Sequence, residues 1–193
     1  MNKNIKVMIS NHHVHLIQED FNILFGKGYE LTVKRSLGGT EFAANETVSI
    51  IGPKGTIENI RILGPLRQYT QVELLRSDTY VLGVNPQIAE SVESCDPIEL
   101  TIKGPQGQIT KKCGIIAWRH IHTPAQNGIM LGLKDHDIVS VKVEGERGLI
   151  FNQVLVRFMD PKYDKYKLDT VFHIDTEEAN AAYLNNGDMI AIV

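Results

Sequence analysis

The sequence predicts a mainly β protein built from two similar halves. A glycine turn recurs three times between runs of β-type residues, at 52–55, 104–107 and 145–148. Glycine supplies the positive φ that tight hairpins need, so this pattern is typical of antiparallel strands. The tripeptide H-x-H also occurs twice, at 13–15 and 120–122, each after an apolar stretch and before a short helical segment. Helix signals elsewhere are few.

Composition excludes several classes of protein. A chain of 193 residues can form one domain or two small ones with a real core. Its formal net charge of −3 offers no basic surface for a nucleic acid. Apolar runs are too short to cross a bilayer, so we expect no membrane partner. Cys95 and Cys113 have no metal-ligand spacing, and we interpret them as reduced cytosolic thiols.

The predicted strands flank the glycine turns. Residues 48–51 and 57–63 surround the first turn, 98–102 precede the second, and 139–143 and 150–158 surround the third. Three short helices are expected between them. They span residues 18–25, closed by Gly26, then 123–131, with Thr123-Pro124 as a favourable start, and 177–184, closed near Asn186-Gly187.

A duplication relates the halves. Residues 46–50, their hairpin and 70–73 form one series, and residues 137–141, their hairpin and 170–173 form the other. In this alignment of the two halves, Glu73 and His173 occupy equivalent positions. We therefore expect two domains, 1–94 and 95–193, with an approximate boundary and with an N-terminal strand able to pack with the second half.

The H-x-H segments indicate metal binding. Residues i and i+2 of a strand point to the same face, so each segment aims two imidazoles at one point. Each half adds one further ligand type, and three protein ligands with an open position are typical of catalytic metal sites. His12 and His136 fall outside this pattern and are expected to face solvent. The two predicted ligand sets are His13, His15 and Glu73, and His120, His122 and His173.

The chain resembles the PduL-type phosphotransacylases, the phosphate propanoyltransferase family. The resemblance covers nearly the whole chain in the order of the family. Its matching segments are residues 10–16, 42–48, 52–55, 58–67, 70–73, 119–122, 145–151 and 173–175.

This resemblance implies a fold, a reaction and site residues. The implied fold is a pair of pseudo-duplicated β-barrels capped by short α-helices. The implied reaction interconverts acyl-CoA plus phosphate with acyl phosphate plus CoA, with acetyl or propanoyl as the acyl group. The resemblance assigns two zinc ions, or similar divalent metals, to the two ligand sets, and it assigns Arg67 to phosphate as the catalytic arginine. Guanidinium suits that role because it makes a forked, permanently charged contact with phosphate. Coenzyme A contacts are expected at Ser10, Asn11, Arg61, Leu63, Asn180 and a basic residue at Lys34 or Arg35.

The chain departs from the family pattern at three places. His12 stands where Arg or Lys is usual, Ile17 replaces a capping Ser or Thr, and the segment 34–41 is shorter. Few residues precede the first predicted strand, so we expect no microcompartment-targeting segment and a cytoplasmic protein. A homodimer is compatible with the sequence.

Three other functions fit the sequence less well. A cupin-like metal enzyme fits His13, His15 and Glu19, but Val7 stands where that motif has glycine. An amidohydrolase barrel needs a longer chain with more helix. A non-catalytic metal-binding β module would usually close its site with four ligands, often including cysteine. No serine or cysteine lies in a nucleophile motif such as G-x-S-x-G, which favours direct acyl transfer.

Overall fold

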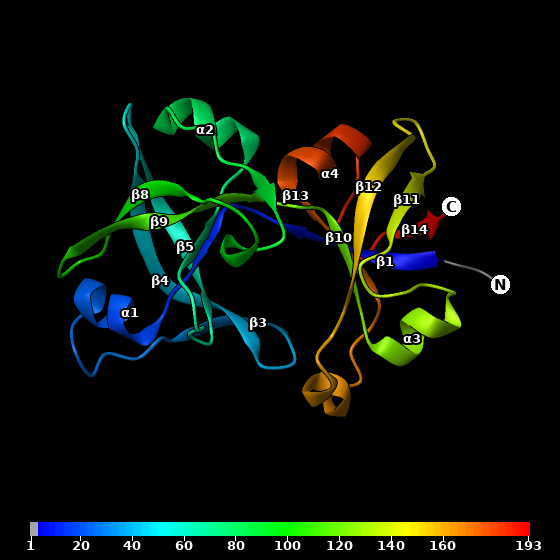
Figure 1. Ribbon diagram of the computed structural model, residues 1–193, viewed down its shortest axis with the longest axis horizontal. Helices are drawn as coiled ribbons and strands as arrows, with labels where there is room; N and C mark the ends of the chain where they lie inside the picture. The colour runs from blue at the N-terminus through cyan, green and yellow to red at the C-terminus, as the bar shows by residue number, and fades with distance from the viewer. Residues whose placement is uncertain (1–3) are drawn as a thin grey trace. The chain divides into compact units, whose positions relative to one another are not determined.

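The computed structural model describes residues 4–193, apart from the side chain of Asp164. Over this range the protein is mainly β, with four short α-helices (Figure 1). The chain divides into two compact units. One contains residues 11–117, and the other combines residues 4–10 with 118–193.

The unit of residues 11–117 is a six-stranded barrel. Its strands pair in the closed order β4-β5-β2-β6-β9-β8, with β8 returning to β4. Strand β3 extends the sheet from β4, and β7 adds to β9. The elements are β2 (His13–His15), α1 (Gln18–Phe25), β3 (Val33–Gly38), β4 (Glu41–Ile51), β5 (Thr56–Gly64), β6 (Gln71–Glu73), α2 (Arg76–Leu82), β7 (Ile88–Ala89), η1 (Val92–Ser94), β8 (Ile98–Lys103) and β9 (Gln108–Ala117).

The other unit is also a closed barrel, in the order β1-β13-β10-β12-β11-β14. Strand β14 pairs with both β11 and β1, which completes the ring. The elements are β1 (Asn4–Ser10), β10 (His120–Thr123), α3 (Ala125–Met130), β11 (Ile138–Val143), β12 (Leu149–Phe158), η2 (Pro161–Tyr166), β13 (Val171–Asp175), α4 (Thr176–Ala182) and β14 (Met189–Ile192).

The two barrels repeat one another strand by strand. Each H-x-H strand, β2 or β10, has a parallel neighbour on one side, β5 or β12, and an antiparallel neighbour on the other, β6 or β13. The correspondence continues through β4 and β11, β8 and β14, and β9 and β1, with the same strand directions. The predicted fold of two similar β-barrels with short helices is thus confirmed.

The division between the units differs from the expected boundary at 94/95. Strands β8 and β9 lie beyond that boundary, yet they pair with β4 and β6 of the earlier half. Strand β1 pairs with β13 and β14 near the end of the chain. The chain therefore passes between units at Ser10/Asn11 and again at Ala117/Trp118.

Two of the glycine turns serve a purpose other than the predicted one. Of the three glycine turns, only the third contains a glycine with the expected positive φ, which is Gly145 with a φ of 114°. A Cβ on Gly52 would lie 2.4 Å from the carbonyl oxygen of Leu82, and a Cβ on Gly104 would lie 2.5 Å from that of Leu24. These glycines thus allow the ends of α2 and α1 to approach the hairpins closely.

The predicted helices begin and end close to their expected residues. Helix α1 has the predicted bounds and ends at Gly26. Helix α3 begins two residues later and ends one residue earlier than expected, whereas α4 begins one residue earlier and ends two residues earlier. Helix α2 was not predicted, although Asp78 in its first turn and the left-handed Gly83 at its end are ordinary helix signals.

Each barrel encloses its own apolar core. In the first, Val14 of β2, Ile62 of β5 and Val72 of β6 are fully buried. In the second, Ile121 of β10 and Phe172 of β13 take the corresponding places. Since neighbours along a strand face opposite sides, these residues send the flanking histidines and Glu73 to the outer face of each barrel.

Candidate metal centres

Strand register brings each predicted ligand set together. His13 lies directly opposite Glu73 on β6, and His120 lies directly opposite His173 on β13. Directly opposed residues of an antiparallel pair share a face and have neighbouring Cβ atoms. In each set of three, the ligand atoms lie within 4.8 Å of one another. The geometry can therefore hold one metal ion at each set.

The His13, His15 and Glu73 cluster is nearly closed off from solvent. The Nε2 atom of His13 lies 3.3 Å from Oε2 of Glu73, and Nε2 of His15 lies 3.6 Å from Oε1. On its other side, Nδ1–H of His13 donates to the carbonyl of Asn11 at 2.8 Å. This bond fixes the ring so that Nε2 faces the cluster, which is the usual arrangement behind a metal-ligating histidine.

Burial and charge set the ionisation of this cluster. Burial lowers the pKa of His15 to about 4, so this ring is neutral near pH 7. Burial also opposes the charged forms of Glu73 and His13, but their mutual attraction and hydrogen bond outweigh it. The pKa of Glu73 is consequently held well below its usual range, and that of His13 is raised.

The His120, His122 and His173 cluster repeats this arrangement with a third imidazole in place of the carboxylate. The rings of His120 and His173 stack with centroids 4.9 Å apart, and that of His122 lies 6.0 Å from His173. Here too the first ring is oriented from behind, because Nδ1–H of His120 donates to the carbonyl of Trp118 at 2.9 Å. All three side chains are half-buried, so solvent reaches this cluster more readily.

Arg67 lies beside the first cluster. Its backbone N–H donates to the carbonyl of Leu16, which directly follows His15, at 2.8 Å. Its positive charge disfavours protonation of both histidines; this adds to the effect of burial on the pKa of His15 and partly offsets the effect of Glu73 on the pKa of His13. The guanidinium is partly exposed and forms a 2.7 Å ion pair with Glu41. The structure thus places a cation next to the cluster, where an anion could be held.

The residues expected to contact coenzyme A fall into both units. Ser10 ends β1 and Asn180 is exposed on α4 of the same unit. In the other unit, Arg35 of β3 and Leu63 of β5 both pair with Ala43 and therefore share a face. Exposed Asn11 precedes β2, and Lys34 is likewise exposed on β3.

Arg61 is already engaged with the barrel. Its guanidinium donates to the carbonyls of Ala44 and Asn45, at 3.1 and 2.7 Å. A contact of Arg61 with coenzyme A would have to use its remaining donors.

His12 does not face solvent as predicted. Its Nδ1–H donates to the carboxylate of Asp78, at 2.9 and 3.1 Å, and 22% of the side chain is exposed. The chain bends here between β1 and β2, which turns this ring toward α2. His136, in contrast, is 64% exposed, as expected.

Gln71 is a further neighbour of the first cluster that the sequence did not reveal. Its Nε2–H donates to Oε1 of Glu73 at 2.8 Å, while its Oε1 accepts from the backbone N–H of Val92. The signal available was its position two residues before Glu73, which puts both side chains on one face of β6.

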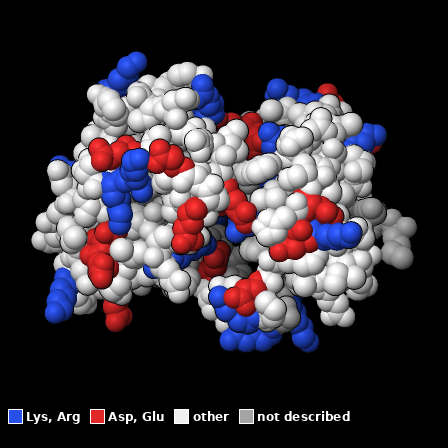
Figure 2. Space-filling view, in the orientation of Figure 1, with Lys and Arg blue, Asp and Glu red and all other residues white. Residues whose placement is uncertain are grey.

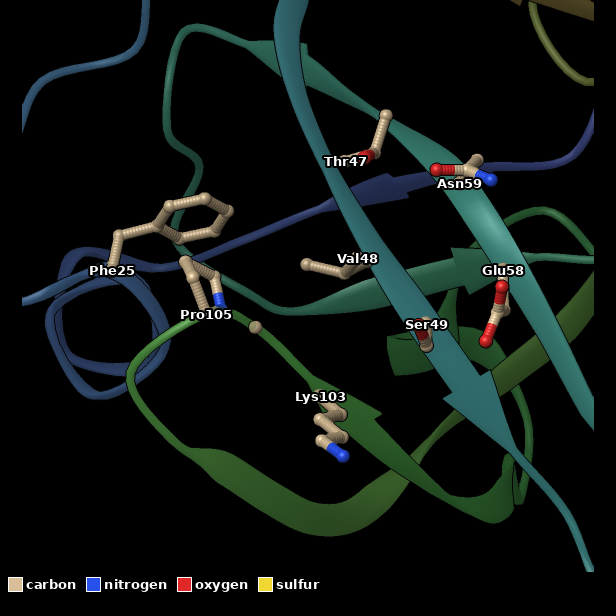
Figure 3. Close-up of a pocket in the computed structure, with 9 residues that line it drawn as sticks. Phe25, Thr47, Val48, Ser49, Glu58, Asn59, Lys103 and Pro105 are labelled. Atoms are coloured by element: carbon tan, nitrogen blue, oxygen red, sulfur yellow. The ribbon is translucent and has the colours of Figure 1, made fainter.

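A separate hollow of about 360 Å³ lies on the barrel of residues 11–117 (Figure 3). Asn59 lines it with a left-handed φ of 61°, at a bulge of β5. Gln153 has the same conformation, φ of 57°, at the corresponding bulge of β12. The bulge is therefore a feature of the repeated barrel, and the hollow contains none of the predicted site residues. Its lining is Phe25, Thr47, Val48, Ser49, Glu58, Asn59, Lys103, Gly104 and Pro105.

Comparisons with known proteins agree with this geometry. Residues 6–185 match the family model of phosphate propanoyltransferase. The chain belongs to the phosphate propanoyltransferase family. A phosphate propanoyltransferase of Thermotoga maritima is 50% identical over 98% of this chain and 89% of its own length. Those of Lachnoclostridium phytofermentans and Rhodopseudomonas palustris are 46% and 43% identical, over 98% and 97% of this chain and 87% and 81% of their own.

Membership of this family makes the chain an acyltransferase, and it disfavours the cupin-like and non-catalytic interpretations. None of the helices within residues 4–193 is long and apolar enough to span a membrane. Acidic and basic side chains are mixed over the face shown in Figure 2.

The low pKa of His15 predicts how the metal-free protein responds to acid. Between pH 6.5 and about 4, the unfolded chain binds a proton at His15 that the folded chain excludes. The free energy of unfolding should therefore fall as the pH is lowered through this window, by up to about 3 kcal/mol at roughly 1.36 kcal/mol per pKa unit. Denaturant titrations of chelator-treated protein should show a weaker pH dependence in His15→Gln. The exposed-site control His136→Gln should retain it, and equal slopes in all three proteins would contradict the assignment.

Proposed function

We propose that this acyltransferase interconverts acyl-CoA plus phosphate with acyl phosphate plus CoA, using a divalent metal, zinc or similar, at each three-ligand cluster. One observation supports the proposal: Arg67, a permanent cation, is bonded through its backbone to Leu16 next to His15, and its charge acts on both histidines of the cluster of His13, His15 and Glu73. A metal site adjoining an anion site suits a reaction between a thioester and phosphate.

The residues present fit a metal ion. Nδ1 of His15 is buried and has no hydrogen-bond partner within the described part of the chain. A neutral buried imidazole offers a lone pair, and imidazole and carboxylate together suit zinc and its first-row neighbours. Asn11 and Trp118 orient the first imidazole of each cluster through their carbonyls. Such ions, when bound, would supply Lewis-acid polarisation of the thioester carbonyl and stabilise its oxyanion.

Arg67 would hold phosphate for attack. Its guanidinium is partly exposed, and its present partner, Glu41, is an exposed carboxylate that an incoming phosphate could replace. The forked donors match two phosphate oxygens, and holding the nucleophile in place removes much of the entropic cost of the encounter. The hydrogen bond from Arg67 N–H to Leu16 keeps this loop against the strand that carries His15.

Direct transfer is favoured over a cysteine acyl-enzyme. Cys113 is buried, and burial raises its pKa to about 12. Burial and the charge of Asp96 also raise the pKa of Cys95. Since the thiolate is the nucleophilic form, neither cysteine is activated for attack on a thioester. The proposed nucleophile is therefore phosphate itself, or CoA in the reverse direction.

An assay of acyl-CoA cleavage tests the proposed function and measures the preference for the acyl group. Release of free thiol from acyl-CoA should require phosphate and should yield acyl phosphate. Acetyl-CoA and propanoyl-CoA should differ by less than about 200-fold in kcat/KM, because one methylene contributes only about 1–3 kcal/mol in an apolar pocket. Thiol release that is independent of phosphate would contradict the proposal, and a larger ratio would contradict the broad specificity.

Metal content gives a second test. Protein purified without chelator should contain close to one ion for each of the two clusters. His122→Ala should lose one ion and most of the activity, because two ligands hold a divalent ion poorly. His136→Ala, which changes an exposed histidine, should lose neither. Elemental analysis that finds no metal in the unaltered protein would exclude the two-metal proposal.

Replacement of Arg67 tests the phosphate site. Arg67→Ala should raise KM for phosphate by about 10- to 100-fold, consistent with the loss of a charged hydrogen bond of roughly 1.5–3 kcal/mol. KM for acyl-CoA should change little. Arg67→Lys should restore phosphate binding only partly, since lysine lacks the forked geometry. Arg76→Ala, in an exposed arginine of the same unit, is the matched control. An unchanged KM for phosphate in Arg67→Ala would show that Arg67 does not bind phosphate.

A further inference from the structure

A carboxylate on α2 joins the two strands that carry the first cluster. Asp78 accepts a hydrogen bond from Nδ1 of His12, at 2.9 Å, and its Oδ2 also accepts from the backbone N–H of Leu75, at 2.8 Å. His12 directly precedes the ligand His13, and Leu75 lies two residues after the ligand Glu73. Only 8% of the Asp78 side chain is exposed.

A carboxylate on α4 occupies the same place in the other barrel. Oε1 of Glu178 forms a 2.8 Å ion pair with Nε of Arg119, while Oε2 accepts from the backbone N–H of Asp175 at 3.5 Å. Arg119 directly precedes the ligand His120, and Asp175 lies two residues after the ligand His173.

The correspondence is positional, although the side chains differ. Asp78 and Glu178 are each the third residue of the helix that follows the third ligand, and each lies five residues beyond that ligand. Their partners, His12 and Arg119, each stand one residue before an H-x-H segment. Two different donor and acceptor pairs thus make the same connection in the two barrels, so the connection itself is the repeated feature.

This connection reaches the ligands through the backbone. The peptides that His12 and Arg119 hold in place follow Asn11 and Trp118, whose carbonyls accept from Nδ1 of His13 and His120. If either peptide shifted, its carbonyl would move, and the imidazole of His13 or His120 that is hydrogen-bonded to that carbonyl would turn. The chain passes between units at these same residues, where β1 and β9 end, so regular strand pairing does not fix the peptides.

We propose that Asp78 with His12, and Glu178 with Arg119, are positioning pairs that orient the first histidine of each metal cluster. The pairs bind no metal themselves. Each connects the residue before the H-x-H strand to the helix after the third ligand of the same barrel, so each should affect its own cluster and not the other. This inference rests on the proposed metal centres.

Competition for Zn²⁺ with a chromophoric chelator tests the pairs on the whole protein. His15→Ala and His122→Ala backgrounds isolate one cluster at a time. Asp78→Asn should weaken Zn²⁺ binding at the first cluster by about tenfold or more, the usual effect of losing a partner behind the ligands. It should leave the second cluster within twofold. Glu178→Gln should show the reverse selectivity.

Rescue and matched controls separate positioning from general stability. His12→Ala should weaken the first cluster, whereas His12→Arg, which copies Arg119, should restore Zn²⁺ affinity. Asp96→Asn and Glu144→Gln remove exposed ion-pair partners in the two units and should change neither affinity. The melting temperature of each metal-free variant is measured alongside.

Three results would overturn the inference. One is unchanged Zn²⁺ affinity in Asp78→Asn and Glu178→Gln. Another is an equal loss at both clusters that follows a fall in the metal-free melting temperature. The third is failure of His12→Arg to restore affinity lost in His12→Ala. Unaltered protein that binds no Zn²⁺ would contradict the metal centres as well, whereas normal binding with any of these results contradicts the pairs alone.

Discussion

The antiparallel register between each H-x-H strand and its neighbour is the constraint on which the site depends. His13 is fixed opposite Glu73 and His120 opposite His173. A slip of one residue would send these polar side chains into the cores that Val14 and Ile121 now fill. Closure of each barrel prevents such a slip, because every strand has a partner on both sides. Core packing and ligand placement are therefore two results of one register.

The two clusters nevertheless differ in charge. Glu73 contributes a carboxylate to the first, whereas His173 contributes an imidazole to the second. In the first cluster Glu73 also pairs with His13, which permits a nearly closed environment without an uncompensated charge. The second set of three imidazoles is half-buried. A divalent ion would thus be less neutralised by its ligands at the second cluster than at the first.

Local sequence patterns predicted the hairpins and the ligand pairs, because short stretches of sequence determine both. Glycine turns located the hairpins, and the period of two along a strand located both ligand pairs. The repeat of 70–73 at 170–173 made Glu73 and His173 equivalent positions. The strand register agrees, because Glu73 lies across from His13 and His173 lies across from His120. Features that depend on distant partners were missed. The pairing of β1 with β13 agrees with the expected packing of an N-terminal strand with the second half, but no local signal showed that β8 and β9 complete the first barrel. His12 looked exposed because its partner, Asp78, lies on a helix 66 residues further along the chain.

Each H-x-H strand is preceded in the sequence by a strand of the other barrel: β1 comes before the first and β9 before the second. This arrangement determines the order in which the two barrels can form. All strands of the barrel of residues 11–117 are synthesised before the second H-x-H. Strand β1 precedes the other described strands in the chain and pairs with β13 and β14, which follow all the others. Its barrel can therefore close only after β13 and β14 have been made. Until then, the alternating apolar residues Ile5 and Val7 lack the core in which they end. Contacts so distant along the chain form slowly, and an unpaired strand can meet other chains in the meantime. The repeated architecture thus combines one barrel built from a continuous stretch of chain with one whose closure joins strands far apart in the sequence.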